Sequence, residues 1–277
     1  MNANVEGLAA ALDHGCDGPL FVHSDLLGAH CYVGKRLKRH ELLATHLNVL
    51  EHVAGGRPVW MPCFNYDYTK TRFIDLREAP CQLGPLAEFM RQLPDVWRST
   101  DPVFSVCGNG EPFGCVPDER QVAFGDRSVF AELYRRDATL LFYGAPFSSA
   151  TAIHYAEFLS GGPIYRYDKV FSGQVIDNDG TKHQLDYVYH VRPWERDLDY
   201  HWPRITAEAV TDGIIREVRT QGRLSSYVVP IRRLIDYWVA ALDRDPFYLL
   251  NESSLTWVQP HYQVVGRRFD ISEFECV

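Results

Sequence analysis

Short apolar runs and amphipathic stretches alternate along the first 160 residues of the chain. The apolar runs are bounded by glycine, proline or polar residues and predict buried strands at 18–25, 58–64, 103–108 and 139–145. The amphipathic stretches predict helices at 35–53, 83–93, 128–136 and 151–159. Strands that alternate with helices are typical of an α/β fold, and we expect a three-layer α/β/α sandwich with a mixed central sheet.

The pattern changes after Gly161–Gly162. Residues 165–193 alternate apolar and polar side chains around Asp179–Gly180, a dipeptide favoured in hairpin turns, so they predict an antiparallel hairpin. We place this hairpin in a β-rich insertion at about 163–204. Two further helices are predicted at 205–222 and 230–246. No internal repeat or low-complexity linker interrupts the pattern, which favours a single domain over 1–277.

The composition is that of a folded globular protein. Hydrophobic residues make up 46% of the 277 positions, and 28 Lys and Arg against 36 Asp and Glu give a formal net charge of −8. No apolar run approaches the roughly 20 residues that span a bilayer, and residues 1–18 carry acids where a signal peptide would carry bases. We therefore expect a cytoplasmic protein with no membrane partner. The negative balance argues against a nucleic-acid partner and favours an amine-bearing substrate.

Neither the cysteines nor the histidines indicate a metal site. The cysteines are odd in number and include no C-x-x-C pair, so a disulfide framework or zinc ribbon is not indicated: Cys16, Cys31, Cys63, Cys81, Cys107, Cys115 and Cys276. Cys63 follows an apolar strand and is the one candidate nucleophile among them, although nothing near it in the sequence would lower its pKa. Six histidines were considered as ligands and lack metal-ligand spacing: His40, His46, His52, His183, His190 and His201.

The sharpest chemical signal is the segment Thr151–Glu157. His154 and Glu157 lie three residues apart on a predicted helix, so their side chains share one face. An imidazole titrates near neutrality, and a neighbouring carboxylate fixes its tautomer, so the pair suits a general base. A surface ion pair with no catalytic role is the alternative. A di-metal bundle would need two such sets, so we expect no metal.

An ordered set of short motifs resembles the aminoglycoside 3-N-acetyltransferase family. The set is His23-Ser24-Asp25-Leu26-Leu27-Gly28, Met61-Pro62-Cys63-Phe64, Leu83-Gly84, Glu88-Phe89-Met90-Arg91, Arg98-Ser99-Thr100-Asp101-Pro102 with Ser105, Phe124-Gly125 with Ser128, Gly144, and Thr151, His154 and Glu157. The resemblance covers about residues 18–160 and is looser beyond. It implies a CoA-dependent N-acyltransferase with acetyl-CoA or a related thioester as co-substrate, no metal, and a small-molecule amine as acceptor. A homodimer is left open.

The resemblance also implies roles for single residues. Thr151, His154 and Glu157 match the family's catalytic element, in which the histidine is the general base and the glutamate holds it. The donors to the thioester oxyanion are implied at the end of the first strand, around Ser24 and the neighbouring backbone N–H groups. The implied cofactor-binding residues are Ser24, Leu27, Arg98, Ser105 and Ser128. Structural alternatives stay open: a strand end for Ser24, a surface ion pair for Arg98 and a helix cap for Ser128.

Two positions depart from the family pattern. The family usually has His before the proline where this chain has Asp101, and Thr where it has Cys63. A carboxylate at position 101 would repel CoA phosphates if it faced them, so we expect Asp101 to point elsewhere. The thiol of Cys63 replaces a strong hydroxyl donor. These changes do not alter the expected fold or reaction class. They affect the expected details of the acyl donor and the amine acceptor.

The acceptor is the open question. Asn65, Tyr66 and Asp67 resemble a version of the motif that implies a nucleotide-linked deoxy amino sugar, with Glu88 as a further substrate-binding candidate. The alternative is an aminoglycoside antibiotic, whose several charges call for several carboxylates, and the chain has no dense acidic tract. The aromatic residues of 165–202 suit either sugar stacking or core packing. A protein that binds CoA or sugar without turnover is a third reading, and the retained dyad argues against it.

Overall fold

A computed structural model describes residues 2–13, 17–113, 119–194, 196–222 and 224–275. Its centre is a seven-stranded sheet in the order β10-β11-β7-β1-β2-β5-β4. The strands are β10 (Arg216–Val218), β11 (Ser226–Pro230), β7 (Thr139–Tyr143), β1 (Leu20–Ser24), β2 (Val59–Pro62), β5 (Val106–Gly108) and β4 (Trp97–Arg98). The three central strands β7, β1 and β2 run parallel, and the outer strands pair antiparallel. The predicted mixed central sheet is confirmed.

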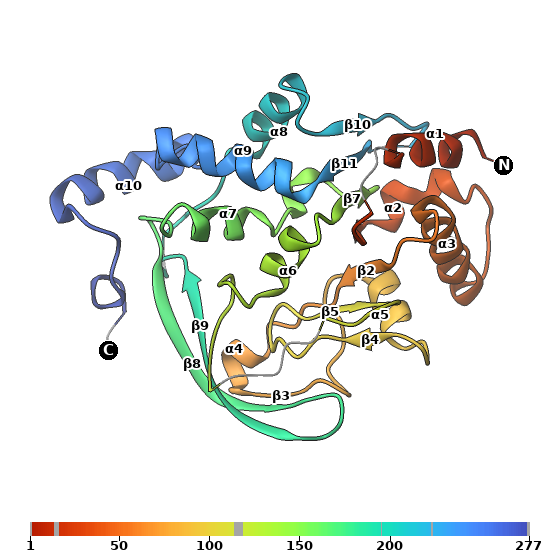
Figure 1. Ribbon diagram of the computed structural model, residues 1–277. Helices are drawn as coiled ribbons and strands as arrows, with labels where there is room; N and C mark the ends of the chain where they lie inside the picture. Colours follow the sequence, from red (N-terminus) through yellow and green to blue (C-terminus); the bar gives the residue numbers. More distant parts are fainter. Residues whose placement is uncertain (1, 14–16, 114–118, 195, 223, 276–277) are drawn as a thin grey trace.

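Helices cover both faces of this sheet (Figure 1). On one face lie α1 (Ala3–Leu12), α3 (Arg39–Ala54) and α5 (Pro85–Arg91), and on the other lie α6 (Val129–Arg135), α7 (Ile153–Leu159) and α9 (Ile231–Arg244). Strand β1 shows why both faces are filled: Leu20 and Val22 pack in the cluster with α1 and α3, while Phe21 packs in the cluster with α6 and α9. Successive strand side chains point to opposite faces, so a fully apolar strand needs cover on both.

The hairpin belongs to a second sheet. Strands β8 (Tyr167–Ile176) and β9 (Lys182–Val191) pair antiparallel along their whole length, and Gly180 adopts a positive φ of 92° in the turn. The expectation of a simple insertion was incomplete, because β3 (Phe73–Asp75) and β6 (Arg120–Val122) from the first half pair with β8 and β9. An exposed hairpin edge is a pairing surface, and two short strands cover it here.

Most predicted helices are confirmed within a few residues, but the segment 205–222 is not one helix. Helix α8 (Trp202–Thr211) ends at Asp212–Gly213, where Gly213 has a φ of 65°, and the chain then enters β10. Glycine tolerates this left-handed conformation, which stops a helix. Helix α10 (Glu252–Val265) was not predicted, nor was α1. The remaining short helical elements are α2 (Leu26–Ala29), α4 (Tyr68–Thr71) and three 3-10 turns, His30–Tyr32, Phe147–Ser149 and Ile271–Glu273.

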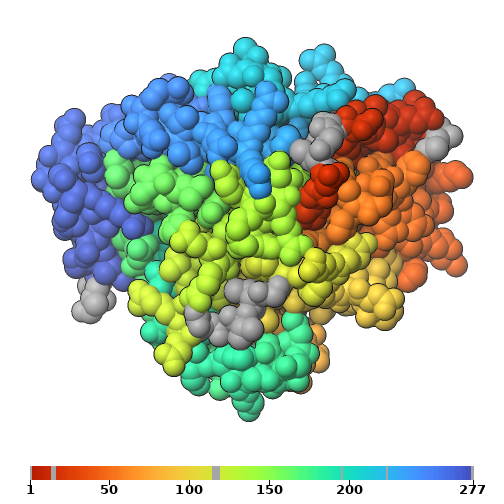
Figure 2. Space-filling model, viewed as in Figure 1, coloured from red at the N-terminus to blue at the C-terminus, as the bar shows by residue number. Residues whose placement is uncertain are grey.

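The space-filling view shows the N-terminal helices, in red and orange, at one side of the molecule and the C-terminal helices, in blue, at the other (Figure 2). The tip of the β8–β9 hairpin, in teal, forms a third side. Within the described residues, no helix combines the length and apolar character needed to cross a membrane.

Candidate active site

A cavity of about 310 Å³ opens where β1 and β2 end. Carboxyl ends of parallel strands are the usual ligand-binding edge of an α/β sheet, because the following loops diverge there. Its walls come from the strand ends, from α5 and the residues before it, from α7 and the turn before it, and from the start of α8 and the segment before it. The lining residues are Val22, His23, Ser24, Asp25, Pro62, Phe64, Tyr66, Leu83, Ala87, Ala145, Pro146, Ser148, Ser149, Ala150, Thr151, Ile153, His154, Tyr200 and Trp202.

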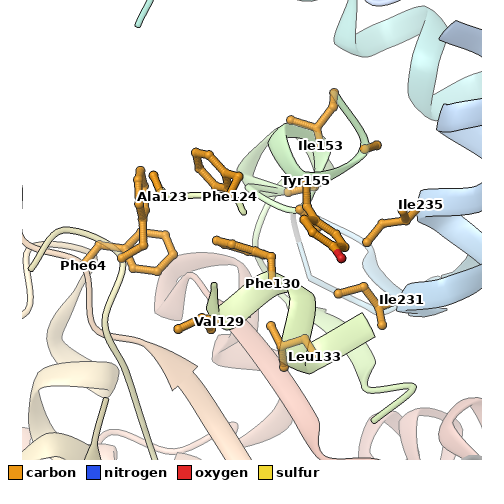
Figure 3. Close-up of a cluster of buried hydrophobic side chains, with 14 of the residues drawn as sticks. Phe64, Ala123, Phe124, Val129, Phe130, Leu133, Ile153, Tyr155, Ile231 and Ile235 are labelled. Carbon is orange, nitrogen blue, oxygen red and sulfur yellow. The ribbon is translucent and has the colours of Figure 1, made fainter. Parts of the chain in front are cut away.

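The dyad predicted from the sequence is formed in the structure. His154 Nδ1 lies 2.7 Å from Glu157 Oε2, and the imidazole lines the cavity with 16% of its side chain exposed. Ile153 and Tyr155, on either side of His154, are buried in the hydrophobic cluster that includes Ile231 of α9 (Figure 3). These two anchors fix the rotation of α7. A carboxylate only accepts hydrogen bonds, so Nδ1 carries the proton and Nε2 keeps a lone pair.

Four more side chains surround the carboxylate of Glu157, which is fully buried. The hydroxyls of Tyr165 and Tyr200 donate to Oε1 at 2.7 and 2.6 Å. Arg166 Nε and His190 Nε2 lie 3.8 and 3.7 Å from Oε2. The tyrosine and arginine groups favour the ionised carboxylate, because each directs a donor or a positive charge at it.

These surrounding groups and the burial of the site shift the pKa values of both members of the dyad. Burial by itself raises the pKa of Glu157, but Arg166, His154 and His190 outweigh it and hold that pKa below its usual range. Burial lowers the pKa of His154 below its usual value, Glu157 acts in the opposite direction, and Arg166 lowers it further. The imidazole is therefore uncharged near neutral pH, which is the state that a general base needs.

The same cluster does not suit a metal ion. His154, Glu157 and His190 are the one group of three ligand-type side chains close enough to share an ion in the part of the chain that the structure describes. However, the Arg166 guanidinium stands 3.8 Å from the shared carboxylate oxygen, and His154 uses its Nδ1 for that carboxylate. A cation there would meet a fixed positive charge, so the geometry favours acid–base chemistry.

Some of the predicted site residues line the cavity beside His154. Ser24 lies at the end of β1, Thr151 precedes α7, and Tyr66 closes the cavity from the loop after β2. Asp25 adds one carboxylate to the wall, and its Oδ1 accepts a hydrogen bond from the backbone N–H of Leu27. The structure thus brings Ser24 and His154, which are 130 positions apart in the sequence, to one cavity.

Leu27 and the backbone near it do not behave as expected for cofactor binding. The Leu27 side chain is 83% exposed and does not line the cavity. Its N–H is engaged with Asp25, and the N–H of Asp25 donates to Tyr143 O at 3.0 Å. Two of the backbone donors expected near Ser24 are therefore already bonded within the chain. The Ser24 residue itself lines the cavity, and its hydroxyl is a candidate oxyanion donor at this strand end.

Arg98 and Ser105 are buried away from the cavity, and we correct their expected role. Arg98 donates to the carbonyl oxygens of Leu76, Ala79 and Cys63 and to Ser105 Oγ, which itself donates to Cys63 O at 2.7 Å. Arg98 was expected either at CoA phosphates or in a surface ion pair. Its donors instead join β4 to the segments that follow β2 and β3, because buried carbonyl groups need partners.

Four other candidates have structural partners. Ser128 caps α6 by accepting from Ala131 N, as its alternative reading predicted. Asn65 is buried, and its side chain donates to Pro80 O and accepts a hydrogen bond from Asp67 N, which closes a turn. The side chain of Asp67 is exposed and lies outside the cavity lining. Glu88 pairs with Arg91 at 2.7 Å and also lies outside the lining. Of the predicted substrate-binding residues, Tyr66 alone lines the cavity.

The two departures from the family pattern are both buried. Asp101 accepts hydrogen bonds from the N–H groups of Val103 and Phe104, from Gln121 and from Tyr187, so it points into the protein as expected. Contact with Cys107 and burial raise the pKa of the Cys63 thiol to about 12. A protonated, fully buried thiol is not a nucleophile. Cys16, Cys115 and Cys276 lie outside the described residues, and Cys31, Cys63, Cys81 and Cys107 are free.

Sequence reasoning missed the residues that surround the dyad. Tyr165 and Tyr200 were noted only as aromatic residues for stacking or packing, and Arg166 received no role. Tyr200 reaches Glu157 because its segment pairs with Leu250 and is held by Ser254 at the start of α10. A helix that was not predicted therefore positions it, and no local spacing signals the contact.

His23 also received no role from the sequence beyond its place in the first motif. It lines the cavity, stacks on Phe142 with ring centroids 5.1 Å apart, and has a buried Nε2 for which the described residues provide no hydrogen-bond partner. Burial lowers the pKa of His23 to about 4. The ring is therefore uncharged over the working range of most enzymes.

Comparison with known proteins accounts for this arrangement. A profile of the family described as aminoglycoside 3-N-acetyltransferase matches residues 52–243, which is more than half of the chain. This chain belongs to the aminoglycoside 3-N-acetyltransferase family. The resemblance inferred from the motifs is confirmed. Family members are CoA-dependent N-acyltransferases, and acetyl-CoA is the co-substrate expected for this chain.

Individual relatives are distant. The chain is 31% identical over 100 residues to the SPbeta prophage-derived aminoglycoside N(3')-acetyltransferase-like protein YokD of Bacillus subtilis (strain 168), an alignment that spans 35% of this chain and 34% of YokD. The structure of AAC-IIIb with CoASH has a TM-score of 0.66 at 19% identity, covering 87% of this chain and 96% of that one. AAC(3)-IVa in complex with a gentamicin has a TM-score of 0.63 at 19% identity, covering 90% and 91%. These structures share the fold.

Proposed function

We propose that this protein transfers the acetyl group of acetyl-CoA to a primary amine of an amino-sugar acceptor, with an aminoglycoside as the acceptor class. The observation that carries the proposal is the dyad: His154 Nδ1 is bonded to Glu157, and the ring lines the cavity with Nε2 free to accept a proton. Thr151 lines the same wall and its carbonyl accepts from His154 N, so it fixes the start of the catalytic turn.

The proposed reaction has a simple proton balance. Nε2 of His154 takes a proton from the acceptor ammonium, and the freed nitrogen lone pair attacks the thioester carbonyl carbon. The carbonyl oxygen becomes an oxyanion, to which the Ser24 hydroxyl is placed to donate. The C–S bond then breaks and the sulfur leaves as the CoA thiolate. The second proton of the nitrogen passes to this thiolate, which gives the amide and CoA, and His154 releases the first proton to solvent.

Two classes of amino sugar are candidates for the acetyl acceptor. The family description and the neighbour with a bound gentamicin support an aminoglycoside. One observation favours a less cationic acceptor, the nucleotide-linked deoxy amino sugar: Asp25 is the one carboxylate among the described residues that line the cavity. Glu88, an expected substrate-binding carboxylate, is engaged with Arg91, and Asp75 is engaged with Arg77.

Release of CoA thiol in the presence of a panel of amines tests the proposal. We expect kcat/KM to be higher for gentamicin-type aminoglycosides than for a nucleotide-linked 3- or 4-amino deoxy sugar. The reverse ranking would reassign the acceptor and leave the reaction class intact. No thiol release above that of the His154→Gln variant with any amine in the panel would contradict the proposed activity itself.

A further inference from the structure

Glu157 carries a negative charge in a place without solvent. Its side chain is fully buried. An isolated carboxylate in such a place is strongly unfavourable, so its charge needs a positive partner within the protein. Three side chains near it are able to provide one: Arg166, which is always charged, and His154 and His190, which are charged only when protonated. Which of them does so decides whether His154 starts the reaction as a base or as an acid.

Arg166 contacts the carboxylate by two routes. Its Nε lies 3.8 Å from Glu157 Oε2 and has no hydrogen-bond partner among the described residues. Its Nη2 donates to the Tyr200 hydroxyl at 2.9 Å, and that hydroxyl donates to Glu157 Oε1 at 2.6 Å. Because the guanidinium occupies a lone pair of the Tyr200 oxygen, the hydroxyl proton is directed to the carboxylate and away from His154 Nδ1, 3.3 Å away.

We propose that Arg166 is the permanent counter-ion of Glu157 and thereby acts as a positioning residue that leaves His154 uncharged and able to accept a proton. The inference rests on the proposed role of His154 as the base. Without Arg166, protonation of His154 would be the way to balance the buried carboxylate. His154 would then already be protonated before the amine binds, and could not take a proton from it.

The other groups that face the dyad do not replace this charge. They come from the segment after α7, from β9 and from the segment before α8: Tyr165, Tyr189, His190 and Tyr200. The tyrosines are neutral donors. Burial lowers the pKa of His190 well below its usual value, so this ring is also neutral. Arg268 pairs with Asp168, which is half exposed, and donates from Nε to the backbone carbonyls of Pro163 and Arg166. Arg166 is therefore the one permanent positive charge within 4 Å of Glu157 among the described residues.

The test compares Arg166→Gln, which removes the charge, with Arg166→Lys, which keeps it. The matched control is Arg91→Gln, which removes a largely buried arginine that pairs with Glu88 on α5 and lies outside the cavity lining. Protonation of the His154 ring is followed by NMR on histidine-labelled protein without substrates, with the His154→Gln variant identifying its signal. We expect the pH at which the His154 ring is half protonated, its midpoint, to rise by about one pH unit or more in Arg166→Gln. In Arg166→Lys and in the control it should rise by less than about half a unit.

The pH dependence of kcat/KM gives the second readout. Its ascending limb should move to higher pH in Arg166→Gln by the same amount, while the KM for acetyl-CoA stays within about twofold of wild type. An unchanged midpoint of His154 protonation in folded Arg166→Gln would overturn the inference, as would an equal shift in Arg91→Gln. The NMR readout needs no turnover, so an inactive wild type would count against the proposed function and leave this measurement valid.

A paired variant covers the case in which Arg166→Gln does not fold. Arg166→Gln combined with Glu157→Gln removes both charges at once, so neither is left buried alone. We expect the pair to be more stable to heat than either single variant, with the His154 midpoint back within about one unit of wild type. A pair no more stable than Arg166→Gln would show that the two charges do not balance each other, and would overturn the inference.

Discussion

At the scale of single residues, His154 depends on side chains that other segments supply. Glu157 is one turn away on the same helix, but Tyr165 and Arg166 follow that helix and Tyr200 lies 46 positions downstream of His154. The donors saturate the carboxylate, so the imidazole has a fixed orientation and a fixed tautomer. Removing the ring and removing its partner therefore have different consequences.

Replacing His154 by Gln should lower kcat by about a hundredfold or more, the usual worth of a positioned base, with little change in the affinity for CoA. Glu157→Gln should lower kcat less, because the imidazole remains, and should lower the melting temperature, because Arg166 loses its opposite charge. Steady-state kinetics with thiol detection and calorimetric titration with CoA measure these effects.

The wild-type pH profile supplies the control for this prediction. Because burial lowers the pKa of His154, the ascending limb of kcat/KM should have its midpoint below 6.5 and should be absent from the residual activity of His154→Gln. Near-normal turnover by His154→Gln at neutral pH would contradict the assignment and direct attention to His23, the other imidazole of the cavity.

At the scale of elements, the cavity wall depends on a close crossing of two backbones. A Cβ at Gly28 in α2 would lie 2.0 Å from Gly144 O, and one at Gly144 would lie 2.2 Å from Ala29 N. Gly144 also has a φ of 64°. Glycine at both positions allows the turn after β1 to touch the turn after β7, which places Ser24 beside the start of α7.

Gly28→Ala should lower the free energy of unfolding by about 2 kcal/mol or more, because the backbone atoms it meets cannot move as a flexible side chain could. It should also lower kcat/KM, since the two cavity walls are pushed apart. Urea denaturation and thiol-release kinetics measure both changes.

Gly7 in α1 offers a matched control. It too is a helical glycine, but a Cβ there meets nothing within 4 Å. Gly7→Ala should raise the free energy of unfolding by up to about 1 kcal/mol, through helix propensity alone, and leave kcat/KM unchanged. Equal stability changes at positions 7 and 28 would show that the close crossing does not constrain the fold.

At the scale of the whole molecule, buried ionisable groups set how stability changes with pH. Burial lowers the pKa of His23 and of His46 to about 4. Unfolding returns each to about 6.5, so their contribution to stability is present above pH 6.5 and is lost as the pH falls towards 4. Burial raises the pKa of Asp101 from 3.8 to about 6, so its contribution has the opposite sign and is lost as the pH rises through 6.

We expect the free energy of unfolding to fall between pH 7 and pH 5. Over this interval, protonation of each of the two histidines lowers the free energy of unfolding by about 2 kcal/mol, and protonation of Asp101 raises it by about 1 kcal/mol. Urea denaturation at the two pH values should show a smaller fall for His46→Phe than for wild type, and a larger fall for Asp101→Asn. Parallel falls in all three proteins would contradict these assignments.

Much of the architecture follows from local patterns. The apolar runs at 18–25 and 139–145 became β1 and β7, because a strand covered on both faces must be apolar throughout. The amphipathic stretches became α3, α6 and α7, and the alternation around Asp179–Gly180 became the β8–β9 hairpin. The error at 205–222 arose because helical spacing continued past Gly213, where the backbone turns.

The sequence by itself also determined the dyad, because His154 and Glu157 are neighbours on one helix face and need no other segment to meet. It could not determine the partners of Arg98, Asn65 and Glu88, which look like ligand-binding residues until their carbonyl and ion-pair partners are seen. Tertiary structure alone decided that Arg166 and Tyr200 reach Glu157. Hydrogen bonds and charges act over a few ångströms in space, and the chain sets that proximity only once the sheets and α10 have packed.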